Sequence, residues 1–292
     1  MEGHTRIVTL ESGYHVWTRQ VGWGSIPVLL LHGGPGATHE YLEILTQYLK
    51  PDEFSLFFYD QLGSYHSDQP HDPSLWTIER FRSEVNEVRR ALGLDRFILY
   101  GQSWGGMLAT EYALTFPEQL QGVVISNMVA SISDYVRRLT LLRQQMDPAL
   151  QSQMLEFEAR ADYFNPRYVE IMDVLYRRHL CRLKEWPPAV TRSFERIAQE
   201  VYGSMQGPNE FVVTGTFKDW DRWDDLHRIR VPALLLVGAH DTMDPESVRD
   251  MGRRIPNAET VVCPDGSHLA MWDDPDHYFP PLLRFLRCNA QA

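Results

Sequence analysis

Cysteine is scarce in this chain. Only three cysteines, Cys181, Cys263 and Cys288, occur in 292 residues, and they lie far apart in the sequence. An odd number of scattered cysteines without metal-ligand spacing argues against a disulfide-stapled fold and against a zinc site. We therefore expect reduced thiols, no metal and no other cofactor.

Long hydrophobic runs and an excess of basic residues are also missing. No stretch approaches the roughly 18 apolar residues that a membrane-spanning helix needs. The first thirty residues mix charged, polar and apolar types, so no secretory signal is visible and the cytoplasm is the expected compartment. A formal net charge of −11 argues against a nucleic-acid surface, which should be basic. The sequence does not predict an oligomeric state.

What the chain does contain is a series of short apolar runs that alternate with segments of helical periodicity. Continuous apolar runs are typical of strands buried on both faces of a parallel sheet covered by helices. The runs occupy residues 26–31, 54–59, 97–100, 122–125, 233–237 and 260–263, and helical patterns occupy 39–49, 78–92, 104–116, 246–254 and 276–287. Residues 6–21 instead alternate polar and apolar types, which predicts an initial hairpin. The fold class predicted is α/β, a doubly wound and mostly parallel sheet.

The middle of the chain breaks this alternation. Residues 127–215 contain few strand-like runs and are interrupted by prolines at 148, 166, 187 and 188. Because the strand pattern resumes afterwards, this segment is predicted to be a helical cap inserted into one core. The predicted division is therefore a first core part at 1–126, the cap at 127–215 and a second core part at 216–292.

A serine between glycines ends one of the apolar runs. Gly101-Gln102-Ser103-Trp104-Gly105 fits the G-x-S-x-G elbow, in which a strand turns sharply into a helix and exposes the serine hydroxyl. A serine hydroxyl needs a base to take its proton and a third group to orient that base. The run at 233–237 is followed by Asp241, and the run at 260–263 by His268, in the chain order expected of a Ser-Asp-His triad.

Other acids and histidines compete for these roles. Asp244 precedes Pro245 at the start of a helical pattern, so an N-cap explains it better than catalysis does. Asp265 lies in the turn-like segment PDGS. His32 and His240 also flank the predicted site, but neither follows both the elbow serine and an acid in the chain order expected of the triad.

Acyl transfer also needs donors for the developing oxyanion. The glycine-rich loop His32-Gly33-Gly34-Pro35-Gly36 can bring a bare backbone N–H close to the elbow, and the N–H of Trp104 would be the second donor.

These motifs together resemble the proline iminopeptidase group of α/β-hydrolases. The resemblance rests on HGGPG at 32–36, YDQLGSYHSDQP at 59–70, GQSWGG at 101–106, NEFVVTGTFKDWD at 209–221 and GSH at 266–268. It implies that Ser103 attacks the carbonyl of an N-terminal residue, that the N–H groups of Gly34 and Trp104 form the oxyanion hole, and that a helical cap covers the site.

The resemblance further implies that a carboxylate binds the substrate's free α-amine, and the matching residue is Glu210. In these peptidases a second glutamate often follows the catalytic aspartate, whereas this chain has Thr242 there. The expected function is a serine hydrolase that removes an N-terminal residue, proline among the candidates, from short peptides or amino-acid amides. An esterase, lactonase or amidase on the same scaffold and a catalytically silent ligand-binding homologue stay open as alternatives.

Overall fold

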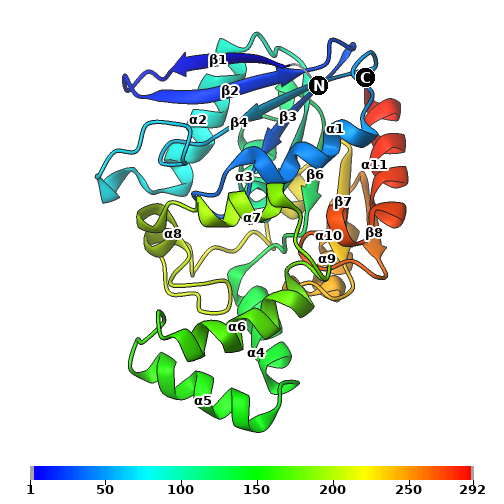
Figure 1. The fold of residues 1–292 in the computed structure, drawn as a ribbon. Coiled ribbons are helices and arrows are strands. Elements are labelled where there is room, and N and C mark those ends of the chain that lie inside the picture. Colours follow the sequence, from blue (N-terminus) through cyan, green and yellow to red (C-terminus); the bar gives the residue numbers. More distant parts are fainter. Residues whose placement is uncertain (1–2, 291–292) are drawn as a thin grey trace.

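A twisted sheet of eight strands organises the protein in a computed structural model that describes residues 3–290 (Figure 1). The strand order is β1-β2-β4-β3-β5-β6-β7-β8. The pairings of β2 with β1 and with β4 are antiparallel, and every later pairing is parallel. The strands are β1 His4–Thr9, β2 His15–Val21, β3 Ile26–Leu31, β4 Phe54–Tyr59, β5 Phe97–Gln102, β6 Leu120–Ser126, β7 Ala233–Gly238 and β8 Ala258–Cys263.

The two faces of the sheet bury separate apolar clusters. Successive side chains of a strand point to opposite faces, and in β3 Leu29 and Leu31 join one cluster while Val28 and Leu30 join the other. Helices α2 (Ile78–Ala91), α3 (Trp104–Thr115) and α9 (Pro245–Arg254) contribute to the first cluster. Helices α1 (Leu45–Tyr48) and α11 (Pro275–Asn289) contribute to the second. The predicted doubly wound α/β architecture is confirmed.

The structure corrects several predicted element bounds. The pattern at 39–49 begins as the 3-10 helix η1 (His39–Ile44) and continues as the single α-helical turn α1. The strand expected at 97–100 extends to Gln102, so that Ser103 follows it directly. Short elements that the sequence did not predict are η2 Pro73–Leu75, η3 Pro117–Gln119, η4 Leu226–Arg228 and α10 Ala270–Asp273.

Five α-helices lie between β6 and β7. They are α4 Ile132–Gln144, α5 Pro148–Ala159, α6 Pro166–His179, α7 Pro188–Glu195 and α8 Gln199–Met205. In Figure 1, α4, α5 and α6 project beyond the strands, and α7 and α8 lie nearer to the sheet. Every helix within residues 3–290 is too short or too polar to span a bilayer. We propose that the segment at 127–215 acts as a cap over the carboxyl ends of the strands.

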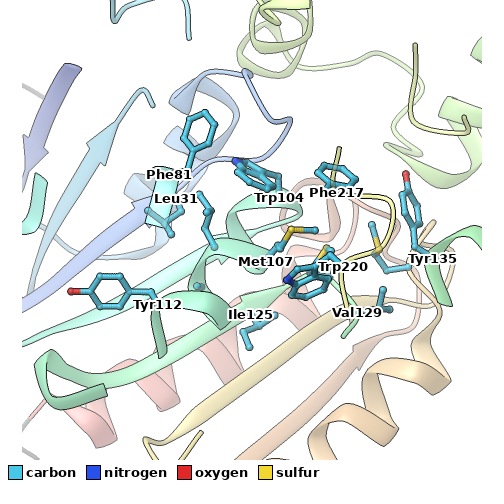
Figure 2. Close-up of a cluster of buried hydrophobic side chains, with 14 of the residues drawn as sticks. Leu31, Phe81, Trp104, Met107, Tyr112, Ile125, Val129, Tyr135, Phe217 and Trp220 are labelled. Atoms are coloured by element: carbon cyan, nitrogen blue, oxygen red, sulfur yellow. The ribbon is translucent and has the colours of Figure 1, made fainter. Parts of the chain in front are cut away.

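The first apolar cluster reaches the elbow. Figure 2 shows Trp104, the first residue of α3, between Phe81 and Phe217. The ring centroids of Trp104 and Phe217 lie 5.9 Å apart in a stacked arrangement, and Phe81 meets Trp104 edge-on at 5.5 Å. The Trp104 indole N–H also donates to Gln61 Oε1 at 2.8 Å. Packing from three segments therefore fixes the residue that follows Ser103.

Candidate active site

Ser103 occupies a sharp turn between β5 and α3. Its backbone φ and ψ angles are 56° and −125°, a conformation that residues other than glycine rarely adopt. The turn brings backbone segments so close that a Cβ on Gly101 would lie 1.9 Å from the Gly105 carbonyl oxygen, and one on Gly105 would lie 2.2 Å from that of Leu31. Both flanking glycines are therefore sterically required, which explains the spacing seen in the sequence.

His268 and Asp241 form a buried pair. The Nδ1 of His268 lies 2.7 Å from Asp241 Oδ1, which fixes the ring tautomer with Nε2 available as an acceptor. Burial lowers the pKa of His268, but the charge of Asp241 and this hydrogen bond outweigh it, so the net pKa is raised. The Asp241 carboxylate also accepts from the Met243 N–H at 3.0 Å. These hydrogen bonds offset the cost of burying the carboxylate.

Sequence reasoning missed a residue that ties the acid to the base. Asn127 follows β6 in a left-handed conformation with a φ of 53°. Its Nδ2 donates to Asp241 Oδ2 at 2.7 Å and to the Ser267 carbonyl oxygen at 3.1 Å. A single side chain thus holds both the Asp241 carboxylate and the residue before His268. No motif signals it, because an asparagine after an apolar run predicts only a turn.

Replacing Asn127 by glycine is expected to lower kcat about tenfold to a hundredfold, because Asp241 Oδ2 would lose its partner and the acid would be held less firmly. Glycine tolerates the left-handed backbone and removes only the amide. The measurement is kcat against pH, with the melting temperature recorded in parallel. An unchanged kcat in a variant of unchanged melting temperature would contradict the positioning role.

The two predicted oxyanion donors lie beside Ser103. Gly34 has a φ of 111°, and with Trp104 and Ser103 it lines one small cavity. In the described part of the chain, neither the Gly34 N–H nor the Trp104 N–H donates to another protein group. Two backbone donors are thus available next to the serine, as stabilisation of a tetrahedral oxyanion would require.

Glu210 belongs to the segment between β6 and β7, and its side chain lies beside His268. Its side chain is 12% exposed, and Oε1 lies 4.0 Å from His268 Nε2. The hydroxyl of Tyr202 lies 3.4 Å from Oε2, and that of Thr242 lies 3.2 Å from Oε1. Burial raises the pKa of the Glu210 carboxyl, and the neighbouring His268 charge partly opposes this rise. This carboxylate lacks a cationic Lys or Arg partner among the described residues, so a ligand cation could take that place.

Two cavities meet at Ser103. The larger, of about 220 Å³, is lined by Ser103, His268 and Glu210 together with side chains of α6 and α7. The smaller, of about 10 Å³, lies toward Met107 and Phe217 and has room for about one water molecule. Ser103 and His268 line the larger cavity together, but within residues 3–290 no hydrogen bond joins them. Proton transfer therefore needs a closer or better aligned approach of the two side chains than this structure has.

The competing residues have other contacts. Asp244 caps α9, accepting from the Glu246 N–H, and Pro245 follows it, so the capping prediction is confirmed. Asp265 is exposed. His32 is fully buried, with its Nε2 accepting from the Gln61 N–H, and burial lowers its pKa. None of these, nor His240, lines either cavity.

Two clusters of side chains have the residue types that could hold a metal ion. His39, Asp60 and His66 form one, and Asp265, Asp274 and His277 form the other, each with ligand atoms within 4.8 Å of one another. In the first, Arg196 Nη1 lies 3.4 Å from His66 Nε2, and this guanidinium would repel a cation. The second cluster is largely exposed. Neither cluster lines the cavities at Ser103, so we assign no metal to this site.

A serine at a strand-to-helix turn, a buried aspartate–histidine pair that follows β7 and β8, and free backbone donors are the features of an α/β-hydrolase site. A model of the family described as "alpha/beta hydrolase fold" matches residues 26–275. The chain belongs to the α/β-hydrolase family, and the relatives described next show that it falls in the proline iminopeptidase-like group.

The relatives extend over nearly the whole chain. It is similar to proteins named proline iminopeptidase from Flavobacterium johnsoniae, at 42% identity over 96% of both chains, and from Elizabethkingia meningoseptica, also at 42% over 96% of both. Among solved structures it resembles VinJ, with a TM-score of 0.93 and 33% identity over 98% of both chains. It also resembles a proline iminopeptidase from Mycobacterium smegmatis, with a TM-score of 0.90 and 29% identity over 99% of both chains.

Proposed function

We propose that this protein is a serine hydrolase that removes an N-terminal residue, proline among the candidates, from short peptides or amino-acid amides. The observation that carries the proposal is the placement of the Glu210 carboxylate in the same cavity as Ser103, close to the ring of His268. A carboxylate in the same cavity as the nucleophile fits the α-ammonium group of the residue whose carbonyl is attacked. The relatives named proline iminopeptidase support the same activity.

The reaction proceeds in two halves. Ser103 Oγ attacks the substrate carbonyl as His268 Nε2 takes the hydroxyl proton, and the N–H groups of Gly34 and Trp104 stabilise the oxyanion. The C–N bond then breaks, and the leaving nitrogen takes the proton from His268. Water, deprotonated by His268, hydrolyses the resulting acyl-enzyme and restores Ser103. Asp241 holds the imidazole and stabilises its charged form throughout.

Amine recognition follows from the cost of burying charge. A partly buried carboxylate without a cationic partner is unfavourable, and a substrate ammonium removes that penalty. A blocked amine cannot do so, and its acyl group would also need room beside Glu210. Free-amine substrates should therefore be selected over N-acetylated ones.

A panel of aryl amides tests this function directly. We expect proline and alanine aryl amides to be cleaved, and their N-acetylated forms to be cleaved about a hundredfold more slowly, because the acetyl group removes the charge that Glu210 binds. The measurement is kcat/KM for each substrate, with a simple aryl ester included. Equal rates for free and acetylated amides would contradict amine recognition. A preference for the ester over every amide would favour the esterase alternative.

The pH dependence of kcat/KM should be bell-shaped. His268 must be neutral to accept a proton, and its pKa is raised above the usual 6.5, so the rate should increase as pH rises through a value above 6.5. The substrate's α-amine must be charged to bind Glu210, so the rate should fall again near the amine's own pKa of about 8. Rates measured from pH 5 to pH 10 would check this. A rise in kcat/KM centred below pH 6.5 would contradict the assignment of His268 as the base.

The cytoplasm remains the proposed compartment, and the predictions that the protein binds no nucleic acid and needs no cofactor remain predictions. The substrate partner we propose is a small molecule or short peptide with a free amine.

A further inference from the structure

The larger cavity has a one-sided charge. Among the described residues that line it, Glu210 is the acid and His268 the only basic side chain, and none is a lysine or an arginine. The rest of the lining is uncharged, including Leu180, Phe194 and Ile197 on the side of α6 and α7. The cavity is therefore suited to a cation at Glu210 and to uncharged groups elsewhere.

Three arginines close in sequence to these lining residues are engaged with other acids. Arg192 of α7 and Arg196, which follows this helix, both donate to Glu40 Oε1, from Nε at 3.1 Å and from Nη1 at 2.7 Å. On α6, Arg177 Nε bonds to Asp173 Oδ2 at 2.7 Å. Arg178, the next residue, is exposed to solvent and does not line the cavity. The structure thus offers no ready cationic partner for an anion placed next to Ser103.

We propose, on the basis of the function proposed above, that the preferred substrates carry no free carboxylate on the residue that leaves. The carboxyl carbon of a dipeptide lies only two bonds from its leaving nitrogen, so that its charge would stand inside the cavity. There it would be partly desolvated without a Lys or Arg partner in the lining, and it would also be repelled by Glu210. The substrate class is therefore an aminoacyl group on an uncharged amine: amino-acid amides, peptide amides and aminoacylated apolar amines.

Charge is selected differently on the two sides of the scissile bond. Glu210 selects a positive charge on the acyl side of the scissile bond, and the cation-free lining selects against a negative charge on the leaving side. A longer peptide satisfies both conditions when its C-terminal carboxylate lies outside the cavity. A free dipeptide satisfies only the first.

The test compares two substrates that differ in one group, Ala-Phe-NH₂ and Ala-Phe with a free carboxylate. We expect kcat/KM to be about tenfold or more higher for the amide at pH 7.5, a factor that corresponds to about 1.4 kcal/mol. Alanine p-nitroanilide serves as the reference for the proposed function. Cleavage of the anilide with equal or faster cleavage of the free dipeptide would overturn the inference and leave the function standing. Failure to cleave any free-amine substrate would overturn both.

A positive charge introduced at the cavity rim tests whether the substrate preference comes from charge or from the chemistry of the leaving group. Gln199 is exposed and lines the cavity at the start of α8. Gln199→Lys should raise the ratio of dipeptide to dipeptide-amide kcat/KM about fivefold or more, because the added ammonium can pair with the carboxylate. Gln199→Met, which adds no charge, should leave the ratio within twofold of the original. A ratio that does not respond to Gln199→Lys in a folded variant would show that the discrimination has another cause and would overturn the proposal.

Discussion

Replacing Ser103 by alanine is expected to reduce turnover of a free-amine aryl amide by about 10⁴-fold or more, while the protein stays folded. The loss follows from removal of the hydroxyl oxygen that we propose as the nucleophile. The fold should tolerate the change because Ser103 Oγ makes no hydrogen bond within the described chain and its neighbours Gly101 and Gly105, which allow the turn, remain.

Three measurements check the Ser103→Ala result. They are the turnover rate, the melting temperature and labelling by a fluorophosphonate probe, which the original protein should take up and the variant should not. Ser83→Ala, an exposed serine on α2, is the matched control and should behave as the original protein does. Original protein that is never labelled would support the silent ligand-binding alternative, and turnover that survives in Ser103→Ala would refute the assigned nucleophile.

The second large effect is expected at Glu210. Glu210→Gln keeps the size of the side chain and removes its charge, so kcat/KM for free-amine substrates should fall about a hundredfold, while the slow cleavage of N-acetylated substrates should change little. The preference for the free amine should therefore largely disappear. This selective loss distinguishes amine binding from general damage to the site, which would slow both kinds of substrate.

The measurement for Glu210→Gln is the ratio of kcat/KM for free and acetylated alanine aryl amides. Glu170→Gln is the matched control, because Glu170 is an exposed acid of α6 that pairs with Arg167 at 2.9 Å. A Glu210→Gln protein that retains the full preference for the free amine would show that another group binds the ammonium. Tyr202 and Thr242, whose hydroxyls contact the carboxylate, would then be examined first.

Local sequence patterns were sufficient to predict the strand-helix alternation and the elbow. Apolar runs on a buried parallel sheet are continuous, and the G-x-S-x-G spacing follows from backbone contacts a few residues apart, so both signals are local. The pairing of Asp241 with His268 was also predictable, because each follows a strand whose end reaches the same edge of the sheet.

Contacts between distant segments were not predictable in this way. Asn127 bonds to Asp241 across 114 positions of the chain, and nothing near Asn127 indicates that partner. The hydroxyl groups around Glu210 come from separate elements, and only the folded chain brings Tyr202 and Thr242 to the same carboxylate. The 3-10 start of the helix at 39–49 likewise lacks a periodic signal distinct from that of an α-helix.

The carboxylate at residue 210 and the three side chains proposed for the chemistry come from different parts of the architecture. Ser103, Asp241 and His268 follow strands of the sheet, whereas Glu210 belongs to the long segment inserted between β6 and β7. Evolution could therefore exchange the inserted segment, and with it the choice of molecules accepted, while the reaction machinery is inherited unchanged. Grafting this segment between family members in the laboratory could change the accepted substrates in the same way.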